Sequence, residues 1–268
     1  METAELKDLI RTRYGNIAAS ASTSSCCGTA PSSCCGSEPA ADAKSLAMGY
    51  SEAELAAAPE GANLGLGCGN PQAIAAMRPG EVVVDLGSGA GFDCFLAARQ
   101  VGPTGRVIGV DMTPEMLGKA RANAAKIGAT NVEFRLGEIE HLPIADAVAD
   151  VVISNCVVNL VPDKAQVFRE AFRVLKPGGR VAISDVVNIA PLPEDLRADP
   201  ALLCGCVSGA IPVERVRSLL NEVGFADIAI AVKPGSREMV AKWVPGRGIE
   251  NCIASAMIEA RKPEAGHG

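Results

Sequence analysis

The stretch EVVVDLGSGAG, residues 81–91, decides the fold class of this chain. Its first half is an apolar run, which is typical of a strand buried on both faces of a sheet. Its second half places glycines at 87, 89 and 91, and FDCFLAARQV (92–101) continues as a helix. Ligands of open α/β sheets bind where such a strand ends in a glycine-rich turn. We therefore expect a ligand site at this turn.

The same alternation of strands and helices continues to residue 187. Strand-like runs are RVIGVD (106–111), NVEFRL (131–136), ADVVIS (149–154) and GRVAISDVV (179–187), with helices expected at 113–128 and 163–177. Strands that lack polar alternation and are separated by helices indicate a parallel sheet covered on both faces. The predicted fold class is therefore α/β, a doubly wound, Rossmann-like sheet.

The chain divides into three parts. Residues 1–44 hold a helix over 4–19 and the tract ASASTSSCCGTAPSSCCGSEPAADA, which has no apolar period and indicates a mobile, thiol-bearing segment. Residues 45–188 carry the glycine-rich turn, and 189–268 form a C-terminal lobe with terminal strands. This last part contains a helix at 212–224, a strand at 226–232 and a final apolar run, which either complete the sheet or form a substrate lobe on it.

Composition and charge exclude several classes of protein. The 268 residues are 48% hydrophobic and 21% charged, as in an ordinary globular chain, and the net charge is −6. Without a positive field, a nucleic-acid substrate is not expected. No apolar run approaches the roughly 20 residues of a membrane span, and the N-terminus lacks the apolar stretch of a signal peptide. We therefore expect a cytoplasmic protein that contacts no membrane.

The ten cysteines fall into two sets. Cys26-Cys27 and Cys34-Cys35 are tandem pairs in the small-residue tract, whereas Cys68, Cys94, Cys156, Cys204, Cys206 and Cys252 are scattered through structured sequence. No paired CxxC zinc pattern is present, and only two histidines occur, so a structural zinc site is weakly signalled. With no export signal, most of these cysteines are expected to be reduced thiols.

The glycine-rich turn does not fit a dinucleotide or a P-loop ligand. Phe92 stands where a dinucleotide fingerprint requires glycine, and the turn has no following Lys-Ser or Lys-Thr pair. Asp111 ends the second strand, where its carboxylate can accept two ribose hydroxyls, and Met112 beside it can cover an adenine face. Glu138 and Ile139 follow the third strand, where an acid can receive an adenine amino group.

These motifs resemble the class I S-adenosylmethionine-dependent methyltransferases. VVDLGSGAG, GVD and LGEIEHLP occur in the order and spacing of that family. The resemblance implies S-adenosylmethionine as cofactor and 45–188 as the core that binds it. The cofactor-binding residues implied are Asp85, Gly87, Ser88, Gly89, Gly91, Asp111, Met112, Glu138, Ile139 and Asn155.

The substrate is indicated by thiols rather than by a general base. His141 is the only histidine in a plausible position for a base. Cys156 follows the fourth strand in SNCVVNL, Cys68 lies in the segment expected to cover the cofactor, and Cys206 lies in the C-terminal part. Three thiolates that converge from three segments would make a soft-ligand cage for a thiophilic ion.

A narrower resemblance covers nearly the whole chain. Tyr14-Gly15, GYSEAELAAAPEGANLGLGCGNP, SNCVVNL, CVSGAI and WVPGRGIENCIASAMIEARKP are similar to the arsenite methyltransferases. It implies that Cys156 and Cys206 hold trivalent arsenic as substrate in arsenic detoxification, with the C-terminal lobe contributing to that site. Cys68 is implied as a third ligand or as the thiol that exchanges during turnover.

The resemblance also implies a redox partner for Cys68. The choice among Cys26, Cys27, Cys34 and Cys35 stays open, because the pairs are tandem. Glutathione or thioredoxin is expected to reset the disulfide. Cys94 is expected to be a small apolar filler in its helix, as unpaired cysteines usually are.

Two alternative functions are kept. One is a small-molecule C- or O-methyltransferase of the quinone type, which would not depend on Cys156. The other is a non-catalytic protein that sequesters metalloids through its thiols. The glycine-rich turn and Asp111 argue against the second alternative, because a sequestering protein needs no cofactor site.

Overall fold

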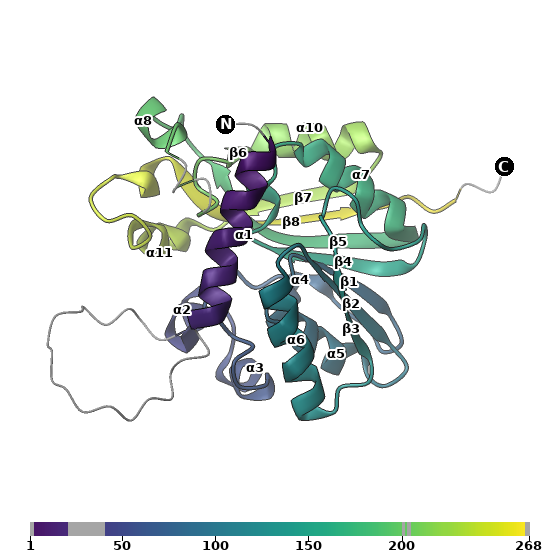
Figure 1. Ribbon diagram of the computed structural model, residues 1–268. Helices are drawn as coiled ribbons and strands as arrows, with labels where there is room; N and C mark the ends of the chain where they lie inside the picture. Colours follow the sequence, from purple (N-terminus) through teal and green to yellow (C-terminus); the bar gives the residue numbers. More distant parts are fainter. Residues whose placement is uncertain (1–2, 21–40, 200–201, 203–204, 266–268) are drawn as a thin grey trace, which may run out of the picture.

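The computed structural model describes residues 3–20, 41–199, 202 and 205–265, and these form a layered α/β fold around one sheet (Figure 1). The strands are β1 (Val82–Leu86), β2 (Arg106–Asp111), β3 (Val132–Leu136), β4 (Ala149–Asn155), β5 (Leu175–Asn188), β6 (Ile211–Pro212), β7 (Ala226–Val232) and β8 (Ile253–Arg261). Their order is β3-β2-β1-β4-β5-β8-β7, and β6 pairs with β5 outside this path.

The direction of the strands places the ligand crevice. β1 to β5 run parallel, and β8 lies antiparallel between β5 and β7. The chain moves outward from β1 to β3 and then returns to β4 on the other side of β1. Connections on the two sides of this reversal leave in opposite directions and open a crevice at the carboxyl ends of β1 and β4.

Helices cover both faces of the sheet, which confirms the predicted doubly wound fold. α4 (Gln72–Ala75), α5 (Phe92–Val101) and α6 (Pro114–Ile127) contribute to the apolar layer on one face. α7 (Lys164–Val174) and α10 (Val213–Val223) pack on the other face. Four of the five β1 residues are buried, because helices exclude water from both sides of this central strand.

Local signals explain where several helices begin and end. Ser51 and Glu54 form both hydrogen bonds of a capping box at the start of α3 (Glu52–Ala57). Pro114 opens α6, and Gly128 ends it in the left-handed conformation. The bounds of α6 agree with the helix predicted over 113–128.

The start of β5 differs from the prediction. The helix expected over 163–177 ends at Val174, and Leu175 already belongs to the strand. Leu175 pairs with Ala149 of β4, and a register shift separates this pair from the rest of the ladder. Lys262 and Gly179 also share a backbone hydrogen bond. Hydrogen bonds to chain segments on both sides therefore keep residues 175–177 in the strand, although their sequence continues the predicted helix.

Segments at both ends of the chain meet over the carboxyl edge of the sheet. They are α1 (Thr3–Ser20), α2 (Ala41–Met48), α8 (Glu194–Arg197) and α11 (Arg237–Ala241). Leu6 and Ile10 of α1 share an apolar cluster with Leu196 and Val240, so residues far apart in sequence close one layer. Figure 1 shows α1 running from the region of β6 down to α2.

The C-terminal strands complete the main sheet, which is the first of the two arrangements expected for this part of the chain. Residues 41–43 belong to α2, although the sequence placed them in the tract without apolar period. Within the described residues, no helix is long and apolar enough to cross a membrane.

Candidate active site

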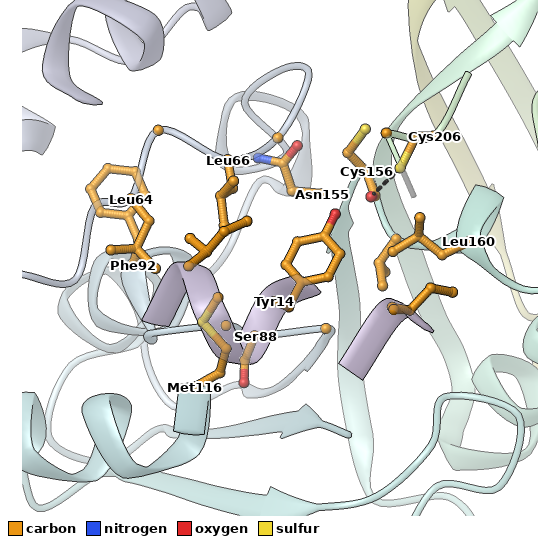
Figure 2. Close-up of a pocket in the computed structure, with 18 of the residues that line it drawn as sticks. Tyr14, Leu64, Leu66, Ser88, Phe92, Met116, Asn155, Cys156, Leu160 and Cys206 are labelled. Carbon is orange, nitrogen blue, oxygen red and sulfur yellow. Dashed lines mark hydrogen bonds between the residues drawn. The ribbon is translucent and has the colours of Figure 1, made fainter. Parts of the chain in front are cut away.

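A large cavity opens at the carboxyl edge of the sheet, beside the reversal in strand order. Its volume is about 1010 Å³. Figure 2 shows Ser88 of the glycine-rich turn toward one end, and Cys156 and Cys206 together at the other. Tyr14 of α1 points its ring into the space between them. The cavity can therefore hold two ligands in contact, one beside the turn and one beside the thiols.

The turn after β1 is held in place by β2. Gly87 and Ser88 donate backbone hydrogen bonds to the carbonyl of Val110. Asp111 accepts from the backbone of Gly89 at 2.9 Å and of Thr113 at 2.8 Å. Burial raises the pKa of Asp111, and these backbone donors oppose that shift. One carboxylate thus fixes the turn while lining the cavity.

Most of the predicted cofactor residues lie on this cavity. Gly91 does not line it; a Cβ there would lie 2.8 Å from the rings of Phe95 and Phe134, so this glycine permits packing of the turn on α5 and β3. The predicted residues that line the cavity are Asp85, Gly87, Ser88, Gly89, Asp111, Met112, Ile139 and Asn155.

Glu138 also lies off the cavity, in contrast to its predicted role. Its carboxylate binds Lys7 at 2.6 Å and Arg11 at 2.8 Å, both from α1. The hydrogen bond from Lys7 lowers the pKa of Glu138 despite partial burial. Glu140 lines the cavity instead and also pairs with Lys7, at 3.0 Å. The acid after β3 therefore anchors α1 over the site.

Near one end of the cavity the three predicted cysteines lie close to one aspartate; Cys156 and Cys206 line the cavity, and Cys68 lies behind them. The Sγ atoms of Cys68 and Cys156 and a carboxylate oxygen of Asp185 lie within 4.8 Å of one another. The Cys206 thiol donates to the Cys156 carbonyl at 2.8 Å (Figure 2). Contact with Cys206, contact with Cys68 and burial, in that order, raise the pKa of Cys156 well above its usual value. Cys156 is therefore a protonated thiol at neutral pH.

Glycines on both sides allow Cys68 to lie against the sheet. A Cβ at Gly67 would lie 2.8 Å from the Asn155 amide, and a Cβ at Gly69 would collide with the hydroxyl of Ser184. Asn155 accepts from the Cys68 backbone at 3.1 Å, and Ser255 donates to the Cys68 carbonyl at 2.7 Å. The motif GLGCG is thus required by a close approach to β4, β5 and β8.

Two of the three cysteines have an uncommon backbone conformation. Cys156 has φ 59° and Cys206 has φ 63°, both in the left-handed region. This region disfavours residues with a Cβ, and backbone strain of this kind clusters at functional sites. The fold therefore holds both cysteines in place at a cost in stability.

A buried polar network, absent from the sequence prediction, connects the Cys68 loop to α5. The Tyr50 hydroxyl donates to Asp93 at 2.8 Å, and Gln72 donates to the Asp93 carbonyl and carboxylate. Asn155 contacts both Tyr50 and Asp93. Burial raises the pKa of both Tyr50 and Asp93. The only feature of the sequence that pointed to this network was Asp93, an acid two residues after Gly91, the last glycine of the turn.

The other predicted residues have different settings. Cys94 is fully buried and donates to Asp85 at 3.1 Å, so it is a core residue of α5 as expected. Cys252 is half-buried. His141 is exposed, and among the described residues no histidine lines the cavity. Residues outside the described part of the chain are Cys26, Cys27, Cys34, Cys35 and Cys204.

Comparison with known proteins identifies the family. A family model described as a methyltransferase domain matches residues 77–224. An arsenite methyltransferase from Halobacterium salinarum is 55% identical over 264 residues, which cover 97% of this chain and 67% of that protein. The chain belongs to the arsenite methyltransferase family.

Two further members support this assignment. An arsenite methyltransferase from Aquipseudomonas alcaligenes is 38% identical over 83% of this chain and 62% of its own length. The crystal structure of an arsenic(III) S-adenosylmethionine methyltransferase from Chlamydomonas reinhardtii is 34% identical, with a TM-score of 0.61 over 86% of this chain and 76% of that one. The chain spans about two thirds of the length of the Halobacterium relative and somewhat less of the Aquipseudomonas one.

Membership in the arsenite methyltransferase family makes this chain an S-adenosylmethionine-dependent methyltransferase. The cavity fits that cofactor on an independent observation: the Ser88 hydroxyl is buried on the cavity and has no hydrogen-bond partner. A buried, unpaired hydroxyl is costly unless a ligand supplies its partner. A polar ligand bound in the cavity beside Ser88 and Asp111 can supply that partner.

Proposed function

We propose that this enzyme transfers the methyl group of S-adenosylmethionine to trivalent arsenic held by Cys156 and Cys206, with Cys68 as third ligand or exchanging thiol. One observation carries the proposal. Cys156 and Cys206 line one end of a cavity whose other end has the predicted cofactor residues, and the Cys68 sulfur lies within 4.8 Å of the Cys156 sulfur. Soft sulfur donors select a thiophilic element over hard cations.

The protonated state of the Cys156 thiol suits arsenite binding. Arsenite is a neutral trihydroxide at neutral pH, and each thiol displaces one hydroxyl as water. One As–O bond and one S–H bond break, and one As–S bond and one water O–H bond form. The raised pKa of Cys156 is therefore no obstacle, because no free proton has to be released.

Methyl transfer then requires positioning and exclusion of water. S-adenosylmethionine supplies an electrophilic methyl group when it is bound. Arsenic held by sulfur keeps a lone pair and attacks that methyl group without a base, in agreement with the exposed position of His141. The rigid strand end carrying Cys156 and the α1 residue Tyr14 restrict the space between the two reactants.

Turnover needs a source of electrons. Transfer of the methyl group oxidises arsenic from the trivalent to the pentavalent state. Two protein thiols can return the electron pair and form a disulfide, for which Cys68 and one of Cys26, Cys27, Cys34 and Cys35 are the proposed pair. Glutathione or thioredoxin is the proposed reductant of that disulfide. This chemistry requires a reducing compartment, which favours the cytoplasm.

The test is a methyl-transfer assay with arsenite, glutathione and the full chain, in which the arsenic products are separated and identified. Cys156→Ser should abolish methylation, because a hydroxyl is a poor ligand for arsenic, while cofactor affinity measured by calorimetry stays unchanged. Cys252→Ser is the matched control, since this half-buried cysteine lies outside the cluster of donor atoms. Full activity of Cys156→Ser with arsenite would instead favour a small-molecule C- or O-methyltransferase. Arsenite binding without cofactor binding would favour a sequestering protein.

A further inference from the structure

We propose that Cys68, Cys156 and Asp185 form a binding site for a divalent metal ion of the zinc type. The donor atoms of these three residues lie within 4.8 Å of one another. Two sulfurs bound to zinc at 2.3 Å with a tetrahedral angle are about 3.8 Å apart, so a contraction of at most about 1 Å brings the two sulfurs to that spacing. This proposal rests on the donor atoms and does not depend on the arsenic chemistry.

The third donor separates this site from the arsenic cage. Trivalent arsenic is proposed to bind sulfur alone, whereas zinc accepts a carboxylate oxygen together with thiolates. Asp185 is 3% exposed and lies three residues before the end of β5, at Asn188. A buried carboxylate next to two thiols has no role in three-sulfur coordination, and it completes the donor set for a divalent cation.

Buried hydrogen bonds orient this carboxylate as in built metal sites. Asn159 donates to Asp185 through its side-chain amide at 2.8 Å and through its backbone at 3.2 Å. The backbone of Val186 also donates to it at 2.8 Å. Such contacts fix the direction of a ligating carboxylate. They leave Oδ2 with a single donor among these bonds, so this oxygen has capacity for a metal.

A backbone hydrogen bond to β5 fixes the position of Cys156, one of the two sulfur donors. The backbone of Cys156 donates to the Ser184 carbonyl at 2.7 Å, next to Asp185 in the chain. The Cys206 thiol donates a hydrogen bond to the Cys156 carbonyl at 2.8 Å. We therefore assign a solvent oxygen, and not Cys206, to the fourth coordination position of the metal. The predicted coordination is therefore two sulfurs and two oxygens.

Charge balance also favours a divalent ion. Binding converts two thiols into thiolates, and their two protons leave to solvent. Two thiolates and the Asp185 carboxylate carry three negative charges. Lys164, which is buried near Asp185, and a divalent ion together supply three positive charges. The occupied site is therefore neutral, which limits the cost of placing charges in a buried position.

The experiment titrates the reduced full chain with Co²⁺ and then with competing Zn²⁺, with no arsenic or cofactor present. The same titration is made on a variant in which Cys26, Cys27, Cys34 and Cys35 are serine, to remove those thiols. Both proteins should show the thiolate charge-transfer band and the visible bands of tetrahedral Co²⁺. Loss of these bands in the four-serine variant would place the metal on those cysteines and overturn the proposal.

Asp185→Asn keeps the size of the side chain and removes its charge. We expect Zn²⁺ affinity to fall by about tenfold or more and arsenite affinity to change by less than about threefold. Cys68→Ser should weaken Zn²⁺ binding, and Cys252→Ser should leave it unchanged. Equal Zn²⁺ affinity in Asp185→Asn and the parent would overturn the proposal.

A measurement on the unsubstituted protein covers the case in which Asp185→Asn does not fold. X-ray absorption at the zinc edge should find two sulfurs at about 2.3 Å and two oxygens at about 2.0–2.2 Å. A shell of three or four sulfurs, or of none, would refute this coordination. Zn²⁺ should also compete with arsenite for Cys68 and Cys156, and this competition should weaken in Asp185→Asn.

Discussion

Glycine at Cys156 or Cys206 should give an inactive protein that is more stable than the corresponding alanine variant. Both cysteines have a left-handed backbone, with φ 59° and 63°, where a Cβ approaches the following carbonyl oxygen. This conformation costs an ordinary residue roughly 1–2 kcal/mol and costs glycine almost nothing. Alanine keeps the Cβ and loses the thiol, so it is the proper reference for the glycine variant.

The magnitude follows from two opposing terms. Glycine removes roughly 1–2 kcal/mol of strain relative to alanine, and its freedom in the unfolded chain returns about 0.4–1 kcal/mol of that gain. Cys206→Gly should therefore exceed Cys206→Ala by about 1 kcal/mol in free energy of unfolding. For a chain of this size, that difference raises the melting temperature by about 2–4 °C.

Equilibrium unfolding in urea with both variants at each position measures this difference. Cys94 in α5 supplies the control, because glycine in a helix interior should be less stable than alanine by about 0.5–1 kcal/mol. The sign of the glycine-minus-alanine difference should thus reverse between Cys94 and the two site cysteines. Equal stabilities of the glycine and alanine variants at both 156 and 206 would refute the argument that these two positions store backbone strain.

Three further outcomes are expected. Asp111→Ala should lower cofactor affinity, measured by calorimetry, by about tenfold or more while arsenite affinity persists, because a charge-assisted hydrogen bond contributes about 1.5–3 kcal/mol. Unchanged cofactor affinity would show that Asp111 does not bind the cofactor. Arsenite affinity should be flat between about pH 6 and 8, because the pKa of Cys156 is raised and neutral thiols release water rather than protons; an affinity that climbs tenfold per pH unit would mean that protons are released on binding. Deletion of residues 21–40 should slow methylation of inorganic arsenite but spare a monomethylated trivalent arsenical, which needs only two protein sulfurs; equal losses on both substrates would assign these residues to the binding site.

Much of the fold could be predicted because its signals are local. The run VVVDL is apolar throughout, and β1 is buried on both faces. Thr113, Pro114 and Gly128 bracket α6 as helix-boundary residues should. The expected helix at 163–177 was too long because the pairing of Leu175 with Ala149 depends on a neighbouring strand, which no local pattern of Lys176 and Pro177 reveals.

The candidate site was predictable where strand ends determine position. Asp111 ends an apolar strand and Cys156 follows one, so parallel pairing brings them to the same edge of the sheet. Glu138 follows the same rule, yet α1 supplies Lys7 and Arg11 to its carboxylate. That contact joins residues more than 120 positions apart, and only packing decides it.

Periodicity and residue type act over a few neighbouring positions, so they were enough to predict the sheet, the glycine-rich turn and the three candidate cysteines. The tertiary structure decided which atoms face one another. Asp185 was visible only as an acid in the apolar run GRVAISDVV, and its approach to Cys68 and Cys156 depends on the meeting of β4, β5 and the GLGCG loop. The left-handed backbone of Cys156 and Cys206 likewise arises from that packing, because non-local contacts alone hold a residue in a conformation its own chemistry disfavours.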